Sequence, residues 1–393
     1  MADLTTPTTP PADRRAAPHA LLSGGGSGGH VFPGLAVATE LQRRGWGVSW
    51  AGARRGMERG LVTRRGLDFH PLPAKPLVGR GPLGKVAALL TLARSAWSAR
   101  NVVRRVGAKV VLGTGGYVSA PAVIGGRLAG VPVVLLEPNA EPGVANRALS
   151  RFAREALVTD GGAPGLRCPT RATGVPIREG FFDIADDLPY GPPLRLLVLG
   201  GSQGARQIND LLPRALAELG DALGPLVVRH QAGKAHLDAT VEAYQSVGIP
   251  AVAVEGGGFR PGGPTVQAEV MPFLHDMPGA MAESHLILSR AGAITLAEIC
   301  AAGRPSLLVP LSIAGGHQVS NAHRQAEAGA AAVLDAAAGV GELRSMLAGL
   351  LGDRDRLDAM AGAARALGRS GAASDIADRV VFWGLGSKAG GTP

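Results

Sequence analysis

Residues 23–30, near the amino terminus, have the composition of a loop that binds phosphate. Their sequence is Ser-Gly-Gly-Gly-Ser-Gly-Gly-His, between an apolar strand candidate (20–22) and a helix candidate (31–42). Glycines let backbone N–H groups approach a diphosphate closely, and a helix start adds unpaired amides and a positive dipole. His30 lies at the rim of this loop, where an imidazole with an ordinary pKa of about 6.5 can act as a general base.

The same glycines also fit the fingerprint of dinucleotide-binding proteins, as Gly24-x-Gly26-x-x-Gly29. In those proteins an acidic residue near the end of the second strand binds the ribose. Here the second strand candidate ends in residues 51–55, Ala-Gly-Ala-Arg-Arg. This ending disfavours NAD and leaves NADP open, so an NADP-linked oxidoreductase is one hypothesis for the chain.

Comparable glycine turns recur after two later apolar runs, at residues 113–116 and 200–204. The second of them opens a new series of alternating strand and helix candidates, so the architecture of the first half starts again. Two such halves with anion-binding turns predict two sheets whose loops meet across a cleft. A transferase with two phosphorylated substrates fits this arrangement best.

Two stretches of the second half carry polar groups near helix starts. Glu298 lies roughly two turns into a helix candidate that begins after Gly292. The first amides of this helix could hold phosphate oxygens while the Glu298 carboxylate accepts hydrogen bonds from a ribose diol. Gln318 and Asn321 share one helix face, where they suit sugar hydroxyls or form only a polar cap and turn.

Length, charge and cysteine content limit the remaining choices. The 393-residue chain is long for one core. We therefore expect a disordered tail (1–19), a first domain (20–177), a linker (178–193), a second domain (194–370) and a last helix at about 375–385 that returns to the first domain. The net charge of +9 favours anionic partners. Only two cysteines are present, which indicates a reducing cytoplasm, and the absence of metal-ligand spacings predicts no metal.

Residues 75–105 mix apolar and basic side chains. Apolar residues such as Leu90 and Trp97 alternate with Lys75, Arg80 and Lys85. This pattern suits a helix that lies in the interface of an anionic membrane, and it equally suits an amphipathic helix that faces its own sheet. A membrane-peripheral scaffold without catalysis is a third hypothesis, although it gives the glycine loops no purpose.

Five motifs, in this order, resemble those of the MurG family. They are GGGSGGHVFPGLAVA (24–38), GGYVS (115–119), GGSQGAR (200–206), SRAGAITLAE (289–298) and GHQVSNA (316–322). The resemblance runs from about residue 21 to residue 383, and several such motifs together are highly specific. Members of this family are UDP-N-acetylglucosamine:N-acetylmuramyl-(pentapeptide) pyrophosphoryl-undecaprenol N-acetylglucosamine transferases of peptidoglycan synthesis.

The resemblance implies an α/β chain with the GT-B fold, in which two Rossmann-like domains with parallel sheets face a cleft. It implies inverting transfer of N-acetylglucosamine (GlcNAc) from UDP-GlcNAc to lipid I, giving lipid II, without a cofactor or a metal. The implied catalytic residue is His30, beside the acceptor hydroxyl. The implied substrate contacts are Ser27, Gly28 and Gly29 at the diphosphates, Asn139 and Arg178 along the cleft, Ser202 at the donor, Leu274 by its backbone near the uracil, Ala293, Ile294, Thr295 and Leu296 at the phosphates, Ala297 in the same turn, Glu298 at the ribose and Gln318 at the sugar.

The implied partners are UDP-GlcNAc, a muramyl pentapeptide acceptor linked to undecaprenyl diphosphate, and an anionic membrane surface, with no nucleic acid. The implied location is the cytoplasmic face of the cell membrane, as a peripheral protein. Another GT-B transferase of UDP-sugars is the alternative within this fold. In one departure, residues 136–139 are Leu-Glu-Pro-Asn where family members often carry His-Glu-Gln-Asn, so this chain lacks two polar groups on the acceptor side.

Overall fold

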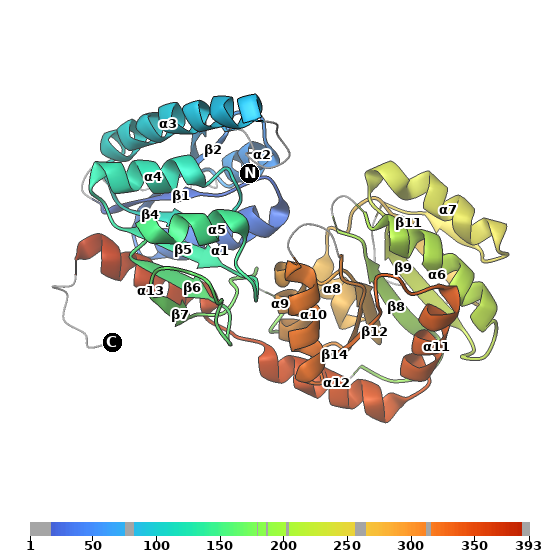
Figure 1. The fold of residues 1–393 in the computed structure, drawn as a ribbon. Helices are drawn as coiled ribbons and strands as arrows, with labels where there is room; N and C mark the ends of the chain where they lie inside the picture. The colour runs from blue at the N-terminus through green and yellow to red at the C-terminus, as the bar shows by residue number, and fades with distance from the viewer. Residues whose placement is uncertain are drawn as a thin grey trace, which may run out of the picture.

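The computed structural model describes residues 17–74, 82–178, 180–185, 188–201, 204–255, 265–311 and 316–386. These residues form two α/β domains, each with a seven-stranded sheet whose neighbouring strands are parallel (Figure 1). The two sheets confirm the predicted fold class of two Rossmann-like domains.

The first sheet has the strand order β3-β2-β1-β4-β5-β6-β7. Its strands are β1 (His19–Ser23), β2 (Gly47–Ala53), β3 (Asp68–Leu72), β4 (Ala108–Gly113), β5 (Val133–Glu137), β6 (Glu155–Val158) and β7 (Thr170–Ala172). Its helices are α1 (Gly28–Arg43), α2 (Met57–Arg64), α3 (Pro82–Arg105), α4 (Ala120–Ala129), α5 (Val144–Leu149) and the short η1 (Ser150–Phe152). The chain order reverses between β1 and β4, which is where open parallel sheets bind ligands.

The side chains of β1 alternate between two buried layers, as a parallel strand covered on both faces requires. Ala20 and Leu22 pack with α1 and with the C-terminal helix α13 (Ala372–Leu385), whereas Leu21 packs with α3 and α4. The helices α1 and α13 therefore cover one face of the sheet, and α3 and α4 cover the other.

The second sheet repeats this plan with the order β10-β11-β9-β8-β12-β13-β14. Its strands are β8 (Leu194–Leu199), β9 (Leu226–Gln231), β10 (Ala251–Ala253), β11 (Gln267–Met271), β12 (Leu286–Ser289), β13 (Ser306–Leu308) and β14 (Ala331–Val333). Its helices are α6 (Arg206–Leu219), η2 (Lys234–His236), α7 (Leu237–Ser246), α8 (Met277–Ala282), α9 (Ala293–Ala302), α10 (His317–Glu327), α11 (Val340–Leu351) and α12 (Arg354–Leu367). The order reverses between β8 and β12, so the turn before α9 lies at the ligand-binding edge of this sheet.

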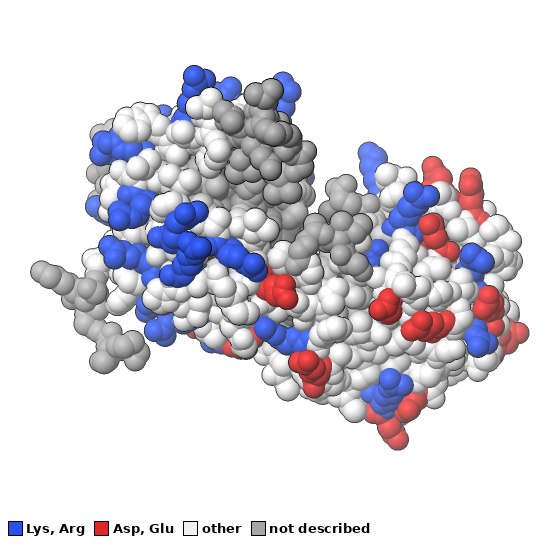
Figure 2. All heavy atoms as spheres, in the orientation of Figure 1, with Lys and Arg blue, Asp and Glu red and all other residues white. Residues whose placement is uncertain are grey.

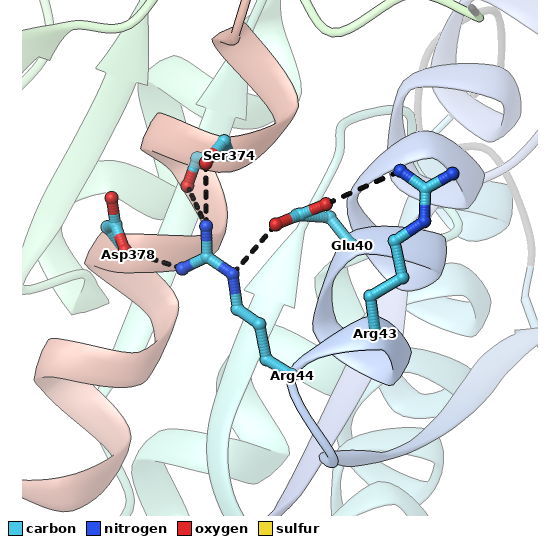
Figure 3. Close-up of polar contacts among 5 residues, drawn as sticks. All are labelled: Glu40, Arg43, Arg44, Ser374 and Asp378. Atoms are coloured by element: carbon cyan, nitrogen blue, oxygen red, sulfur yellow. Dashed lines mark hydrogen bonds and ion pairs between the residues drawn. The ribbon is translucent and has the colours of Figure 1, made fainter.

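After α12 the chain returns to the first domain, where α13 packs beside α1 (Figure 1). Ile376 and Val380 of α13 are fully buried in the core that α1 covers. Arg44 fastens the two helices through hydrogen bonds to Ser374 and an ion pair with Asp378 (Figure 3). The C-terminal helix therefore connects the second domain to the first along the same face as α1.

Candidate active site

Thr114 joins the two glycine turns that follow β1 and β4. Its backbone N–H donates to the Ser23 carbonyl (2.8 Å), and its hydroxyl donates to the His30 carbonyl (2.6 Å). A Cβ on Gly24 would lie 1.9 Å from the Thr114 hydroxyl oxygen, so this approach requires glycine. The two turns are therefore locked together at the point where the strand order reverses.

His30 is oriented by the same threonine. The Nδ1 atom of His30 lies 3.1 Å from the Thr114 carbonyl oxygen. Because a carbonyl only accepts, Nδ1 carries the proton and the neutral ring keeps its lone pair on Nε2. Gly115 (φ +100°) and Gly116 (φ +75°) pass the ring so closely that a Cβ on them would lie 2.7 Å from Nδ1 and 3.2 Å from Cδ2, respectively. Both the backbone angles and the contact with the imidazole require glycine there.

Several groups around His30 set its protonation. Burial lowers the pKa of His30 below its ordinary value, and His317 at the start of α10 acts in the same direction. The Glu137 carboxylate and the Thr114 carbonyl oppose this shift in pKa. The imidazole is therefore neutral at neutral pH, which is the state that a general base needs.

Glu137, the last residue of β5, organises the loop that follows it. Its buried carboxylate accepts hydrogen bonds from the backbone N–H groups of Asn139 (3.1 Å) and Gly143 (2.9 Å). It also accepts from the side-chain amides of Asn139 (2.8 Å) and Asn146 (3.0 Å). Four donors on one carboxylate fix the shape of this loop, and the preceding Leu136 is fully buried in the sheet.

Asn139 extends this network to the second domain. The Asn139 side-chain oxygen accepts from Asn321 Nδ2 (3.2 Å), and the Asn321 oxygen accepts from the Ala140 N–H (2.9 Å). Asn321 Nδ2 also donates to the carbonyl of Ala291, just before α9 (3.2 Å). In this structure Asn321 therefore links the two walls of the cleft through its own amide.

The start of α9 presents backbone amides on the opposite wall. Gly292 precedes this helix, and the Leu296 N–H already donates to the Gly292 carbonyl (2.9 Å). The amides of 293–295 are those that a helix start leaves without an intrahelical partner. Leu296 and Ala297 lie with Ala293 along an interdomain pocket of about 440 Å³. Of the predicted phosphate contacts, the structure therefore favours the first three residues over Leu296.

Glu298 and Arg178, both predicted to bind substrate, meet each other in this structure. The Arg178 guanidinium donates to the Glu298 carboxylate at 3.1 Å. Burial raises the pKa of Glu298, and Arg178 opposes that shift. Arg178 also lies over the ring of Phe32 in α1, with 5.9 Å to the ring centroid. The pair thus connects α9 of the second domain to α1 of the first.

Two other residues predicted to bind the donor, Leu274 and Gln318, lie after β11 and in α10, respectively. Leu274 is buried in the turn after β11. The Gln318 side-chain oxygen accepts from the Leu311 N–H (3.0 Å), which leaves its NH₂ group for a ligand. Ser202 lies outside the described residues.

In the first domain, Gly28 and Gly29 form the first turn of α1. Ser27 precedes the helix, is exposed and makes no capping hydrogen bond through its side chain. The Ser27 hydroxyl and the first amides of α1 therefore lie close to His30, next to the two turns that Thr114 joins.

Sequence analysis missed Thr114 and His317. Thr114 lies in a turn whose glycines alone predict phosphate binding, and its partner His30 is 84 residues away. His317 was visible in the motif GHQVSNA, but only the structure brings it near His30. No group of three or more His, Cys, Asp and Glu side chains that could hold a metal ion occurs in the part of the chain that the structure describes. Transfer without a metal stays a prediction.

Comparisons with known proteins agree with this geometry. Residues 20–158 match the glycosyltransferase family 28 N-terminal domain, and residues 195–380 match the C-terminal domain of that family. The chain is 42% identical over 364 residues to the UDP-N-acetylglucosamine–N-acetylmuramyl-(pentapeptide) pyrophosphoryl-undecaprenol N-acetylglucosamine transferase of Pseudomonas putida strain F1, covering 91% of this chain and 96% of that one. It is 43% identical to the same-named protein of Ectopseudomonas mendocina, with the same coverage.

The chain belongs to the MurG family of glycosyltransferase family 28. Acinetobacter baumannii MurG has a similar structure, with a TM-score of 0.75 and 31% identity over 93% of this chain and 99% of that one. The forosaminyltransferase SpnP, at 15% identity and a TM-score of 0.64, shares the fold. Family membership confirms the resemblance and removes the support for an NADP-linked oxidoreductase.

The Glu137 carboxylate should control the pKa of His30 in this MurG-family chain. Glu137→Gln removes a negative charge that favours the imidazolium, so we expect a His30 pKa further below about 6.5 than in wild type. His317 acts on the pKa of His30 in the opposite direction to Glu137, so His317→Gln should raise the pKa of His30. NMR titration of labelled histidines measures both, and shifts of the same sign in the two variants would contradict this electrostatic description.

Proposed function

We propose that the chain transfers GlcNAc from UDP-GlcNAc to lipid I with inversion, giving lipid II. The observation that carries this proposal is the contact of His30 Nδ1 with the Thr114 carbonyl, which leaves Nε2 without a proton, on a helix (α1) that contacts α9. A base for an acceptor hydroxyl thus lies on α1, and the adjacent helix α9 begins with amides suited to a leaving diphosphate. Membership in the MurG family supplies the identities of the two substrates.

On the acceptor wall, His30 Nε2 takes the proton of the acceptor hydroxyl as its oxygen attacks the anomeric carbon of GlcNAc. The new glycosidic bond forms as the bond from that carbon to the diphosphate breaks, and UDP leaves with its electron pair. The turn after β1, with Ser27, Gly28 and Gly29, would hold the diphosphate of the acceptor. His30 can then return its proton to the solvent after release of the products.

On the donor wall, the amides of 293–295 and the helix dipole of α9 would stabilise the charge that develops on UDP. Glu298 would accept hydrogen bonds from the ribose. Its ion pair with Arg178 must break for these hydrogen bonds to form. The Gln318 amide is open to the transferred sugar, and Leu274 and Ser202 complete the proposed donor contacts. Arg178, once released from Glu298, remains close enough to meet the nucleotide.

We further propose that the α3–α4 face of the first domain binds the membrane that carries the acceptor. Leu89 (54% exposed), Leu90 (62%) and Trp97 (58%) project from α3, and Leu128 (51%) projects from the adjacent α4. Arg100 lies over the Trp97 ring at 4.7 Å from its centroid. No helix among the described residues is long and apolar enough to cross a bilayer.

The charge distribution supports the same face. Figure 2 shows Lys and Arg side chains prevailing on the visible face of the first domain and Asp and Glu side chains gathered on the second. Arg94, Arg104 and Arg127 are exposed on α3 and α4. Lys75 and Arg80, and the side chain of Lys85, lie outside the described residues. Exposed apolar area with flanking arginines suits peripheral binding to anionic lipid, which we place at the cytoplasmic face of the cell membrane.

Two substitutions should separate the proposed chemical and binding roles. His30→Gln should lower kcat by about 10²- to 10⁴-fold while the affinity for UDP is retained, because only the base is lost. Glu298→Ala should weaken UDP binding by about 10-fold or more, because a carboxylate that accepts ribose hydrogen bonds is lost. Turnover of UDP-GlcNAc with a lipid I analogue and calorimetry with UDP measure these effects.

The exposed His323 of α10 supplies a matched control, since His323→Gln should change neither quantity. Full activity of the His30→Gln variant would contradict the assignment of His30 as the general base. Wild-type turnover of a different acceptor, with none of lipid I, would favour another GT-B transferase of UDP-sugars.

Membrane binding is tested by the double variant Leu90→Asp, Trp97→Asp. Two negative charges in place of exposed apolar side chains that the membrane would bury should reduce binding to vesicles of anionic phospholipid by about 10-fold or more. Val252→Asp, at a similarly exposed apolar residue of β10 in the second domain (51% exposed), should bind as wild type does. Unchanged sedimentation of the α3 double variant with vesicles would rule out this face.

A further inference from the structure

A groove of about 370 Å³ runs along α1 on the face of the first domain away from α3 and α4. One stripe of α1 forms its floor, at 32, 35, 36, 39, 40 and 43, which are successive helical neighbours. Val175, Ile177 and Phe182 form a second wall, and the start of α13 forms a third. None of the substrate contacts implied by the family motifs, apart from Arg178, lies in this groove.

More basic than acidic side chains line the groove. Among the described residues that line it, the basic ones are Arg43, Arg65, Arg178 and Arg369, and the acidic one is Glu40. Figure 3 shows Glu40 held between two guanidinium groups, Arg44 at 2.8 Å and Arg43 at 3.7 Å. Glu40 is therefore already paired with these two arginines.

Arg65 is the cation of the groove that is most open to a ligand. It is exposed, and its guanidinium makes no ion pair or hydrogen bond with the residues that the structure describes. Arg369, in contrast, is already paired with Asp160 (2.6 Å) and Asp375 (3.1 Å). A ligand carboxylate would thus meet Arg65 without breaking an existing pair.

The groove begins at the reaction centre. Arg178 lines the groove, pairs with Glu298 on the donor wall and lies over Phe32. Phe32 follows His30 by two residues in the first turns of α1. A group attached to the reacting sugar of the acceptor could therefore enter the groove while the sugar itself stays beside His30.

We propose that this groove binds the peptide of the acceptor, with Arg65 meeting a peptide carboxylate; this inference rests on the proposed function. The lipid end of such an acceptor is drawn to the exposed apolar residues of α3 and α4, on the opposite face of the sheet. The peptide is joined to the muramyl group through its amino end, so its C-terminal carboxylate is free. Lipid and peptide then leave the reaction centre in opposite directions.

The dimensions of the groove agree with this occupant. From Phe32 to Arg43, α1 rises by about 16 Å at 1.5 Å per residue. Five extended residues span about 17 Å. The apolar side chains near Phe32 and Leu35 would contact the first peptide residues, and the arginines near the far end would contact its carboxylate.

The test compares two acceptors, a lipid I analogue with the pentapeptide and the same analogue without any peptide. Arg65→Gln should raise KM for the pentapeptide acceptor by about 5-fold or more, with KM for the peptide-free acceptor and for UDP-GlcNAc unchanged. Ala36→Trp, which fills the groove, should have the same selective effect. Arg64→Gln, at the neighbouring exposed arginine outside the groove, should leave all three values unchanged.

Equal KM values for wild type and both groove variants with the pentapeptide acceptor would overturn the inference. Equal changes for both acceptors would also overturn it, because the effect would not depend on the peptide. Failure of the wild-type enzyme to glycosylate either acceptor would overturn the proposed function itself, and with it this inference.

Discussion

The contact between Thr114 and His30 is the constraint on which the site depends. The Thr114 carbonyl accepts a hydrogen bond from His30 Nδ1 (3.1 Å), its hydroxyl donates to the His30 carbonyl, and its N–H donates to the Ser23 carbonyl. These bonds join the turns after two adjacent strands and select the tautomer with a bare Nε2. The glycines around them follow from this contact, because any Cβ at 24, 115 or 116 would collide with the threonine, the imidazole or the facing backbone.

A second chain of hydrogen bonds connects the first domain to the second. It runs from the Glu137 carboxylate through the amides of Asn139 and Asn321 to the carbonyl of Ala291, immediately before α9. The electrostatic influence of Glu137 on His30 therefore depends on a loop that the second domain also holds. The Arg178–Glu298 pair is the part of this interface that the donor must rearrange, since the same carboxylate is the proposed ribose acceptor.

Much of this arrangement could be predicted from the sequence, because it rests on local patterns. Apolar runs followed by glycine turns gave the strands at whose ends the site lies, and Gly292 marked the start of α9. Contacts between distant segments could not be predicted in this way. The helical spacing of Asn321 predicts a sugar ligand or a helix cap, whereas the structure pairs its side chain with that of Asn139, 182 residues away. The polar helix α2 and strand β3 carry little apolar periodicity, so the position of Arg65 beside α1 emerged only from the tertiary structure.

The pH dependence of kcat/KM for GlcNAc transfer to a lipid I analogue tests the central claim most directly, because this quantity reports the ionisation of the free enzyme. The lowered pKa of His30 predicts that activity falls only below about pH 6.5, as the imidazole takes up a proton. The residual activity of His30→Gln should lack this acid limb. An acid limb at or above pH 6.5, or one that persists unchanged in His30→Gln, would contradict the assignment of His30 as the base.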